Sequence, residues 1–478
     1  MKTIKLNSIA VALLLLFNSC STNPVTGKRD VMFISEDQEL AMGKESDPQI
    51  VSQFGLYENA AMQRFIQEKG QKMAAVSHRS DIPYEFKILD SPVINAFAVP
   101  GGYVYFTRGI MAHFNNEAQF AGVLGHEIGH IAARHSAKQQ SKAVLAQLGM
   151  VVGMAVSPEF GQFAQAAQQG IGLLFLKFGR DDERQSDELG VEYSTKIGYD
   201  AQQMAGFFQT LARKQEEGTA AVPDFLSTHP SPEDRYQTVT QLAEQWQKKT
   251  NKANVAVNRD SYLRLIDGII YGEDPKQGYV ENQVFYHPVM KFQFPIPAGW
   301  NFQNTPQMVQ MAPQDGKAMM MLTLAPGASL EEAAQQVLQA YQLQAKESRQ
   351  VKVNGLPALA LIAEQQQEQA VLRALAYLIQ YGGNIFALIG VSNANDFNNY
   401  QPAFSNTMES FRQLTDAGKI NRKPEKVRVK PVTKSTTLAQ ALRSFQIPEK
   451  RHEEVAVLNG MQLNDQLAAG TLIKVIGQ

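Results

Sequence analysis

Residues His126, Glu127 and His130 form the pattern His-Glu-Ile-Gly-His, whose residue types suit a hydrolytic metal site. On a helix, residues four apart share one face, so both imidazoles can reach one Zn²⁺ while Glu127 lies beside the metal-bound water. Zinc catalysis requires three protein ligands and one open coordination position. The question that decides the class of site is therefore where the third ligand lies.

One class of zinc peptidase takes its third ligand from the same segment, in the pattern H-E-x-x-H-x-x-G-x-x-H. Here Ala133 and Ser136 stand where that pattern has Gly and the third His, and His135 comes one position early, which rejects this class. A second class takes a glutamate from another helix and follows it four residues later with an aspartate that orients a ligand histidine. Glu183 and Asp187 have this spacing and predict that arrangement.

Several segments beyond the two histidines resemble one family. They are Asn23-Pro24-Val25-Thr26-Gly27, Asn95-Ala96-Phe97-Ala98-Val99-Pro100-Gly101-Gly102, the histidine pair, Glu183 to Gly190, and Thr228-His229-Pro230-Ser231-Pro232-Glu233-Asp234-Arg235. Together they resemble the zinc metallopeptidase family 48 of the M (metallo) class, which includes CAAX prenyl endopeptidases, HtpX proteases and BepA-like proteases. The resemblance spans most of residues 23 to 250. Gln185 and Ser186 stand where the family often has Glu and Ala, and neither is an expected ligand.

The resemblance implies a zinc metalloendopeptidase with one Zn²⁺ per chain. His126, His130 and Glu183 are the expected metal ligands. Glu127 is expected to take a proton from the attacking water and pass it to the leaving amine. Asp187 is the expected partner that orients a ligand imidazole.

The family pattern also places His229 near the site, as a catalytic residue. It would either stabilise the oxyanion or cap the zinc in a latent state. The alternative is an ordinary loop histidine, since a single His beside two prolines is not diagnostic. The remaining histidines show no ligand spacing and are interpreted as structural or surface groups: His78, His113, His135, His287 and His452.

The extended run from Ala98 to Phe106 is suited to binding a substrate peptide by strand addition, in which main-chain hydrogen bonds hold the peptide. The alternative is an ordinary structural strand. The residues predicted to bind substrate are Ala98, Val99, Gly101, Gly102, Tyr103 and Val104.

The elements around these residues are expected to be mainly helical from Ile34 to about Thr250. A capping box of Ser35 with Gln38 opens the region. Strand-like residues at 86–89 and 96–107, broken by Pro100-Gly101-Gly102, interrupt it. The apolar stretch Val144 to Val156 is too short to span a bilayer and predicts a buried or covering helix.

A turn-rich stretch at about 255–280 suggests a boundary, and an alternation of strands and turns follows to about residue 416. The pattern predicts hairpins at Asn354-Gly355 and Gly382-Gly383-Asn384. Two helices are expected, one from the cap Ser329 to about Ala345 and one from Asp396 to Leu414. Without a catalytic cluster, this unit is expected to be a structural or binding α+β sandwich that resembles the PsbP/Mog-like fold.

The last part of the chain opens with a basic, proline-containing stretch, Lys419 to Lys434, which is interpreted as a solvated linker. Residues 427 to 478 then resemble a LysM module, which implies a possible peptidoglycan partner. The usual Gly-Asp of that module is replaced by Ser435-Thr436, which weakens the case for glycan binding.

The N-terminus has the form of an export signal, in which Lys2 and Lys5 precede an apolar run from Ile9 to Phe17. Cys20, the chain's single cysteine, lies at the end of this segment. A chain with one cysteine can form neither an intramolecular disulfide nor a Cys-based metal site.

The position of Cys20 resembles that of a bacterial lipoprotein signal, in which the Cys carries the lipid that anchors the mature chain. Ser21 then favours sorting to the outer membrane, with the protein on the periplasmic side of the cell envelope. Phe17 and Asn18 depart from the usual lipoprotein pattern, so an ordinary cleaved signal is the alternative.

The predicted fold class is multidomain, namely a mainly α-helical gluzincin-type metallopeptidase domain with a small edge-strand sheet, an α+β sandwich and a small α/β LysM-like module. The predicted boundaries are 1–20 for the signal, 21–255 for the peptidase, 256–418 for the sandwich and 419–478 for the linker and module. The charge balance, 45 Lys plus Arg against 46 Asp plus Glu, gives no support for nucleic-acid binding.

The predicted function is hydrolysis of peptide bonds in misfolded or unassembled envelope proteins. One alternative is a binding or chaperone-like envelope lipoprotein with a latent metal site, which the two accessory units suggest. The other alternative is a peptidoglycan-associated factor, which only the LysM-like segment supports.

Overall fold

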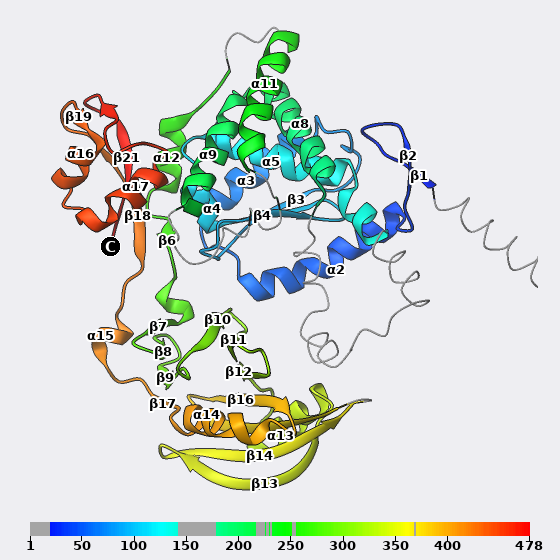
Figure 1. Cartoon of the computed structure of the whole chain (residues 1–478), viewed down its shortest axis with the longest axis vertical. Coiled ribbons are helices and arrows are strands. Elements are labelled where there is room, and N and C mark those ends of the chain that lie inside the picture. Colours follow the sequence, from blue (N-terminus) through cyan, green and yellow to red (C-terminus); the bar gives the residue numbers. More distant parts are fainter. Residues whose placement is uncertain are drawn as a thin grey trace, which may run out of the picture.

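The computed structural model describes residues 20–141, 178–216, 225, 229, 232–250, 255–367 and 370–478 (Figure 1). The export signal and the helix predicted over Val144 to Val156 lie outside these residues. Of the helices that are described, none is long and apolar enough to cross a membrane.

The first part of the chain, called here the helical unit, packs helices around a three-stranded sheet (Figure 1). As predicted, Ser35 and Gln38 form a capping box that starts its first helix. The helices are α2 (Glu36–Phe54), α3 (Ala60–Ala74), α4 (Arg108–His113), α5 (Glu117–Ala132), α8 (Arg180–Lys196), α9 (Gln202–Glu216), α11 (Pro232–Thr250) and α12 (Arg259–Ile266).

The small sheet has β5 (Tyr103–Thr107) at its centre, parallel to β3 (Glu85–Leu89) and antiparallel to β4 (Ala96–Val99). The predicted glycine bend between β4 and β5 is confirmed, with φ of +83° at Gly101 and +96° at Gly102. A Cβ on Gly101 would lie 2.7 Å from the Glu39 carbonyl oxygen, and one on Gly102 would lie 2.0 Å from the Pro83 carbonyl oxygen. Both positions therefore require glycine for conformation and for space.

A buried ionic cluster fixes the end of α5 against α2. Glu39 of α2 accepts hydrogen bonds from Arg79 and Arg134, each at 2.8 Å. Nearby, β1 (Cys20–Thr22) and β2 (Arg29–Val31) form a hairpin, and the side-chain amide of Asn23 donates to the carbonyl of Ala133 at 3.2 Å. These contacts hold the N-terminal segment to the residues that follow α5.

The core of the helical unit extends past the predicted boundary near residue 255. Tyr262, Leu263 and Ile266 of α12 are at most 1% exposed and belong to the same hydrophobic core as the helices before them. The turn-rich sequence signal was therefore wrong for this stretch, because a short amphipathic helix lies within it.

The sheet unit, residues 279–413, contains a seven-stranded antiparallel sheet in the order β10-β11-β12-β16-β15-β14-β13 and a four-stranded sheet in the order β17-β9-β8-β7. Both predicted hairpins are confirmed. The strands are β7 (Tyr279–Glu281), β8 (Val284–His287), β9 (Phe292–Pro295), β10 (Trp300–Asn304), β11 (Met308–Pro313), β12 (Ala318–Leu324), β13 (Gln344–Val353), β14 (Leu356–Gln366), β15 (Val371–Tyr381), β16 (Asn384–Asn393) and β17 (Arg412–Gln413).

Two helices pack on the seven-stranded sheet, each in a core of its own. α13 (Leu330–Ala340) contributes to one core and α14 (Phe397–Glu409) to the other. Both helices end before their predicted ends, because Gln342 adopts a φ of +52° ahead of β13 and the chain leaves α14 to form β17.

The C-terminal segment, residues 425–478, returns to the helical unit (Figure 1). Its elements are β18 (Glu425–Pro431), β19 (Thr436–Thr437), α16 (Leu438–Ser444), α17 (His452–Leu458), β20 (Gln466–Leu467) and β21 (Leu472–Gly477). β18 pairs with β21 and with β6 (Ile270–Tyr271). Much of the stretch predicted as a solvated linker is therefore a strand, since its valines alternate with basic residues and Val427 is fully buried.

This segment shares its hydrophobic core with the helical unit, so the predicted boundary at residue 419 does not separate two cores. Val427, Leu442 and Ile473 are all fully buried in that shared core. The ammonium group of Lys474, also fully buried, donates to the carbonyls of Ala112, His113 and Phe114 at the end of α4, at 2.9–3.4 Å. An ammonium can satisfy carbonyls that a helix C-terminus leaves without partners.

Candidate active site

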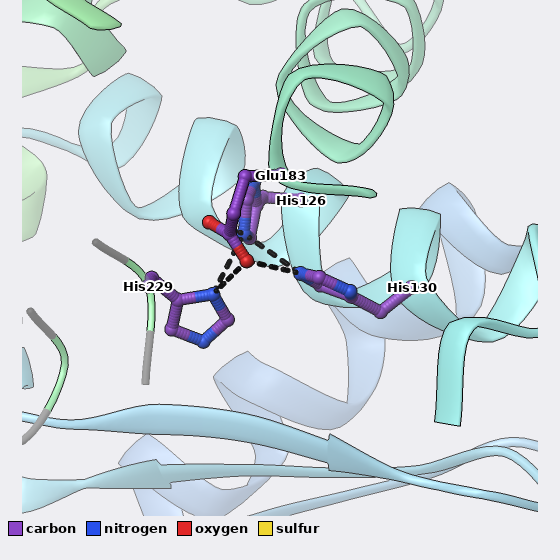
Figure 2. Close-up of side chains that lie close together, drawn as sticks. All are labelled: His126, His130, Glu183 and His229. Atoms are coloured by element: carbon purple, nitrogen blue, oxygen red, sulfur yellow. Dashed lines mark hydrogen bonds and ion pairs between the residues drawn. The ribbon is translucent and has the colours of Figure 1, made fainter. Parts of the chain in front are cut away.

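The predicted metal ligands converge in the interior of the helical unit (Figure 2). His126 and His130 project from one face of α5, and their Nε2 atoms lie 3.0 Å apart. Glu183 of α8 reaches the same point, with carboxylate oxygens 3.6 Å from Nε2 of His126 and 3.5 Å from Nε2 of His130. Together with His229, these residues each offer one ligand atom, and these atoms all lie within 4.8 Å of one another.

Small residues allow α5 and α8 to approach closely enough for this geometry. A Cβ on Gly125 would lie 2.9 Å from the Gly190 carbonyl oxygen, and one on Gly129 would lie 3.1 Å from Cβ of Leu189. A Cβ on Gly190 would lie 3.0 Å from the backbone nitrogen of His126. The glycines of both sequence motifs therefore bring the glutamate helix to the histidine helix.

Asp187 lies where the sequence motif predicts, beside a ligand imidazole. Its Oδ1 atom is 2.9 Å from Nδ1 of His126. Arg235 of α11 binds the same carboxylate through two nitrogens, at 2.8 and 2.5 Å. Burial alone would raise the pKa of Asp187, but Arg235 and His126 outweigh it and lower the pKa to about 2. The carboxylate therefore stays ionised and accepts the Nδ1 proton of His126.

The donor set fits a cation such as Zn²⁺. With its proton on Nδ1, His126 directs a lone pair from Nε2 toward Nε2 of His130. Burial, and then the neighbouring histidines, hold the pKa of His130 well below its usual value, so this imidazole is neutral as a metal ligand must be. Oε2 of the buried Glu183 has no hydrogen-bond partner among the described residues. A cation among these atoms would satisfy all of them.

Glu127 lies beside this cluster and is 1% exposed. Its Oε1 atom has no hydrogen-bond partner in the described structure, and Nε2 of His229 lies 3.7 Å from it. Burial raises the pKa of Glu127, although His229 and His126 oppose the shift. A raised carboxyl pKa suits a group that must both take and return a proton near neutral pH.

His229 is buried inside the cluster rather than in a loop at the surface. Its Nδ1 atom lies 2.9 Å from Oε1 of Glu183 and 3.2 Å from Nε2 of His126. Phe225 stacks on its ring at 4.6 Å between centroids, and the Phe225 backbone N–H donates to the carbonyl of Ile94, just before β4. Burial alone would lower the pKa of His229, but Glu183 and Glu127 raise it above the usual value.

Two residues at the site were missed from the sequence. Arg235 was seen only as the last residue of a family motif, yet it binds Asp187 and lies 3.3 Å from Glu183. His135 was assigned to structural or surface groups, yet its Nδ1 atom lies 3.0 Å from Nδ1 of His130. Helical spacing could not reveal His135, because α5 ends before it and Arg134 adopts a φ of +58°.

The predicted substrate-binding run is only partly available for strand addition. Tyr103 and Val104 lie on the central strand β5, which already pairs with β3 and β4 on its two sides, so this part of the prediction was wrong. Gly101 and Gly102 pack against backbone atoms of α2 and of the residues before β3. Ala98 and Val99 lie on β4, which pairs only with β5 in the described structure.

Comparison with known proteins agrees with this geometry. The family described as Peptidase family M48 matches residues 60–243, which contain both zinc-ligand motifs. Residues 60–243 are therefore similar to peptidase family M48. These matched residues, called here the family M48 domain, run from α3 into α11 and include the helices that carry His126, His130 and Glu183.

Curated relatives match the family M48 domain and its surroundings. The β-barrel assembly-enhancing protease of Yersinia pestis is 31% identical over 224 residues, which cover 44% of this chain and 45% of the relative. The protein of the same name from Escherichia coli is 29% identical over 46% of each chain. The mitochondrial metalloendopeptidase OMA1 of Arabidopsis thaliana is 30% identical over 43% of this chain and 42% of the relative. The chain spans about half the length of these relatives.

Solved structures give weaker likenesses. A protein of unknown function from Pseudomonas aeruginosa covers 29% of this chain and 97% of its own, at 14% identity and a TM-score of 0.21. The cyanobacterial PsbP of Synechocystis covers 27% of this chain and 91% of its own, at 12% identity and a TM-score of 0.22. These scores are too low to support a fold or a function.

Proposed function

We propose that this protein is a zinc-dependent endopeptidase that cleaves misfolded or unassembled proteins of the bacterial cell envelope. The observation that carries the proposal is the buried cluster of His126, His130 and Glu183 beside Glu127, whose Oε1 atom has no hydrogen-bond partner among the described residues. The names of the relatives, β-barrel assembly-enhancing protease and metalloendopeptidase, support both the reaction and the substrate class.

In this proposal His126, His130 and Glu183 hold the metal. When bound, Zn²⁺ polarises the scissile carbonyl and lowers the pKa of water to about 7. Glu127 accepts the proton of the attacking water and donates it to the leaving amine. Asp187, itself held by Arg235, keeps the imidazole of His126 in one tautomer and orientation.

The experiment is to measure zinc content and cleavage of unfolded casein for the mature wild-type chain and for Glu127→Gln. Glu188→Gln is a matched control, since Glu188 is an exposed glutamate on α8. Zinc in all three proteins, with cleavage lost only in Glu127→Gln, is the expected result. A wild-type protein without zinc would overturn the proposal.

A second candidate is a latent form of the same site. His229 already lies among the donor atoms, where it would occupy the coordination position that a catalytic zinc keeps open. His229→Ala separates its two candidate roles. Faster casein cleavage would show that His229 caps the metal, and cleavage at least about 10-fold slower would show that it stabilises the oxyanion.

The proposed location is the periplasmic side of the outer membrane, with the chain anchored through a lipid on Cys20. The hydrogen bond from Asn23 to the carbonyl of Ala133 supports this location, because a lipid on nearby Cys20 would then hold the family M48 domain close to the membrane surface. Loss of labelled-palmitate incorporation in Cys20→Ser tests the anchor.

Peptidoglycan binding by residues 427 to 478 is the remaining alternative, tested by co-sedimentation of the whole mature chain with isolated peptidoglycan.

A further inference from the structure

His135 lies next to the metal cluster although the sequence places it outside the ligand motif. It is fully buried, and its ring meets the ring of His130 nearly edge to face, with centroids 5.0 Å apart and planes at 74°. The two Nδ1 atoms are 3.0 Å apart. The left-handed backbone at Arg134 turns the chain so that this ring faces back toward α5.

The direction of the hydrogen bond between the two rings follows from the role of His130. Its Nε2 atom faces His126 and Glu183, so a ligand lone pair on Nε2 requires the proton of the neutral ring to be on Nδ1. Among the described residues, the acceptor of that proton is Nδ1 of His135. His135 therefore carries its own proton on Nε2.

Two residues of α8 hold His135 in this state. The amide oxygen Oε1 of Gln185 lies 3.0 Å from Nε2 of His135 and accepts its proton. The hydroxyl of Ser186 lies 3.2 Å from Nδ1 of His135, whose single lone pair accepts the proton of His130, and so adds a polar contact to the ring. The nearest carboxylate, Asp182, is farther away at 3.7 Å and is bound instead by Lys138 and Gln139, at 3.2 and 3.1 Å.

Gln185 and Ser186 are neighbours on α8, and their side chains reach the same ring. A side-chain amide offers a neutral oxygen that fixes the Nε2–H of His135. The serine adds a polar contact that alanine cannot make.

We propose that His135, supported by Gln185 and Ser186, is a positioning residue that fixes the orientation and tautomer of the ligand His130. This inference rests on the proposed zinc site and adds to it a second support opposite Asp187. Asp187 accepts the Nδ1 proton of His126, and His135 accepts the Nδ1 proton of His130. Each ligand histidine thus has its own acceptor, one charged and one neutral.

The test is the dissociation constant for zinc ion, measured on the whole mature chain by competition with a chromogenic chelator. His135→Leu keeps a buried apolar side chain but removes the acceptor, and we expect zinc binding to weaken about 10- to 100-fold. His135→Asn places its Oδ1 atom near the position of Nδ1, so it should recover most of the affinity. His113→Leu, at a buried histidine outside the cluster, should bind zinc as the wild type does.

Gln185→Leu leaves the acceptor in place but frees the ring, so we expect a smaller loss of affinity than with His135→Leu. If His135→Leu does not fold, His135→Gln replaces it, because its amide lies nearer the Nε2 position and should not rescue binding. Wild-type affinity in the variant without the acceptor, or equal affinities for His135→Asn and His135→Gln, would overturn the inference. Failure of the wild type itself to bind zinc would instead overturn the proposed function.

Discussion

The sheet unit and the C-terminal segment both follow the family M48 domain in the chain, but they attach to it differently. The sheet unit has two hydrophobic cores of its own. The C-terminal segment has none, and its buried residues join the core of the helical unit. The later segment is therefore the more integral part of the fold.

The reason lies in how the chain leaves and rejoins the helical unit. β6 leads out to the sheet unit and β18 leads back, and the two strands pair, with Tyr271 opposite Glu425 and Ile270 opposite Lys426. The sheet unit is thus inserted between two paired strands (Figure 1). Position along the chain therefore does not decide which segment completes the core around α5 and α8.

Deleting each segment in turn should give the largest difference in the stability of the helical unit. Removing residues 425–478 takes several buried side chains from the shared core at about 2–5 kcal/mol each, enough to exceed a total stability of about 5–15 kcal/mol. Replacing residues 273–424 by a short hairpin turn should leave the helical unit folded, because the paired strands remain adjacent. Thermal unfolding and zinc content are measured for both variants. A truncated chain that still unfolds cooperatively and binds zinc would restore the independent module predicted from the sequence.

Two matched core substitutions should show whether the helical unit and the sheet unit unfold separately. Ile473 and Leu388 are both fully buried, the first in the shared core and the second in the sheet unit, so each change to Ala should cost about 2–5 kcal/mol. The two tryptophans report separately, with Trp246 in α11 and Trp300 in β10.

Urea unfolding followed by fluorescence, with the other tryptophan changed to Phe, separates the two units. Ile473→Ala should shift the Trp246 transition, and Leu388→Ala should shift only the Trp300 transition. Equal shifts at both tryptophans would show that the units unfold as one.

The smallest expected effect is a pH dependence at the contact with the C-terminal segment. Burial lowers the pKa of His113 from 6.5 to about 3, although a hydrogen bond to the Gly109 carbonyl opposes the shift. The groups that face His113 include Lys474, Lys214 and Glu454. Because the unfolded chain binds this proton more readily, the stabilisation is complete above pH 6.5 and is lost as the pH falls toward 3, by about 1.4 kcal/mol per unit.

Urea unfolding between pH 7.5 and about 4.5 checks this dependence, with His113→Leu as the comparison. The difference in unfolding free energy between wild type and variant should change below pH 6.5 in favour of the variant. A difference that stays constant over this range would show that His113 is not buried in its neutral form.

Much of the fold was predictable because it depends on local signals. Ser35 caps its helix as predicted, and the hairpin at Asn354-Gly355 forms where two left-handed residues are needed. The end of α13 and the strand β18 were not predictable. Gln342 is not a residue type that typically ends a helix, although it adopts a positive φ here. The alternating valines of β18 form a strand because β21 and β6 pair with it, and the sequence does not show these partners.

The sequence by itself predicted the candidate metal ligands, because two histidines one helical turn apart are a local pattern and the Glu183–Asp187 pair gains weight from its position after them. Only the tertiary structure showed that Arg235 holds Asp187 and that His135 supports His130, since helix packing and a left-handed turn bring these side chains together. It also decided that the last strand, with Lys474, completes the core of the helical unit. Contacts between residues far apart in the chain produce no repeating pattern in the sequence of either contacting segment, so sequence periodicity cannot predict them.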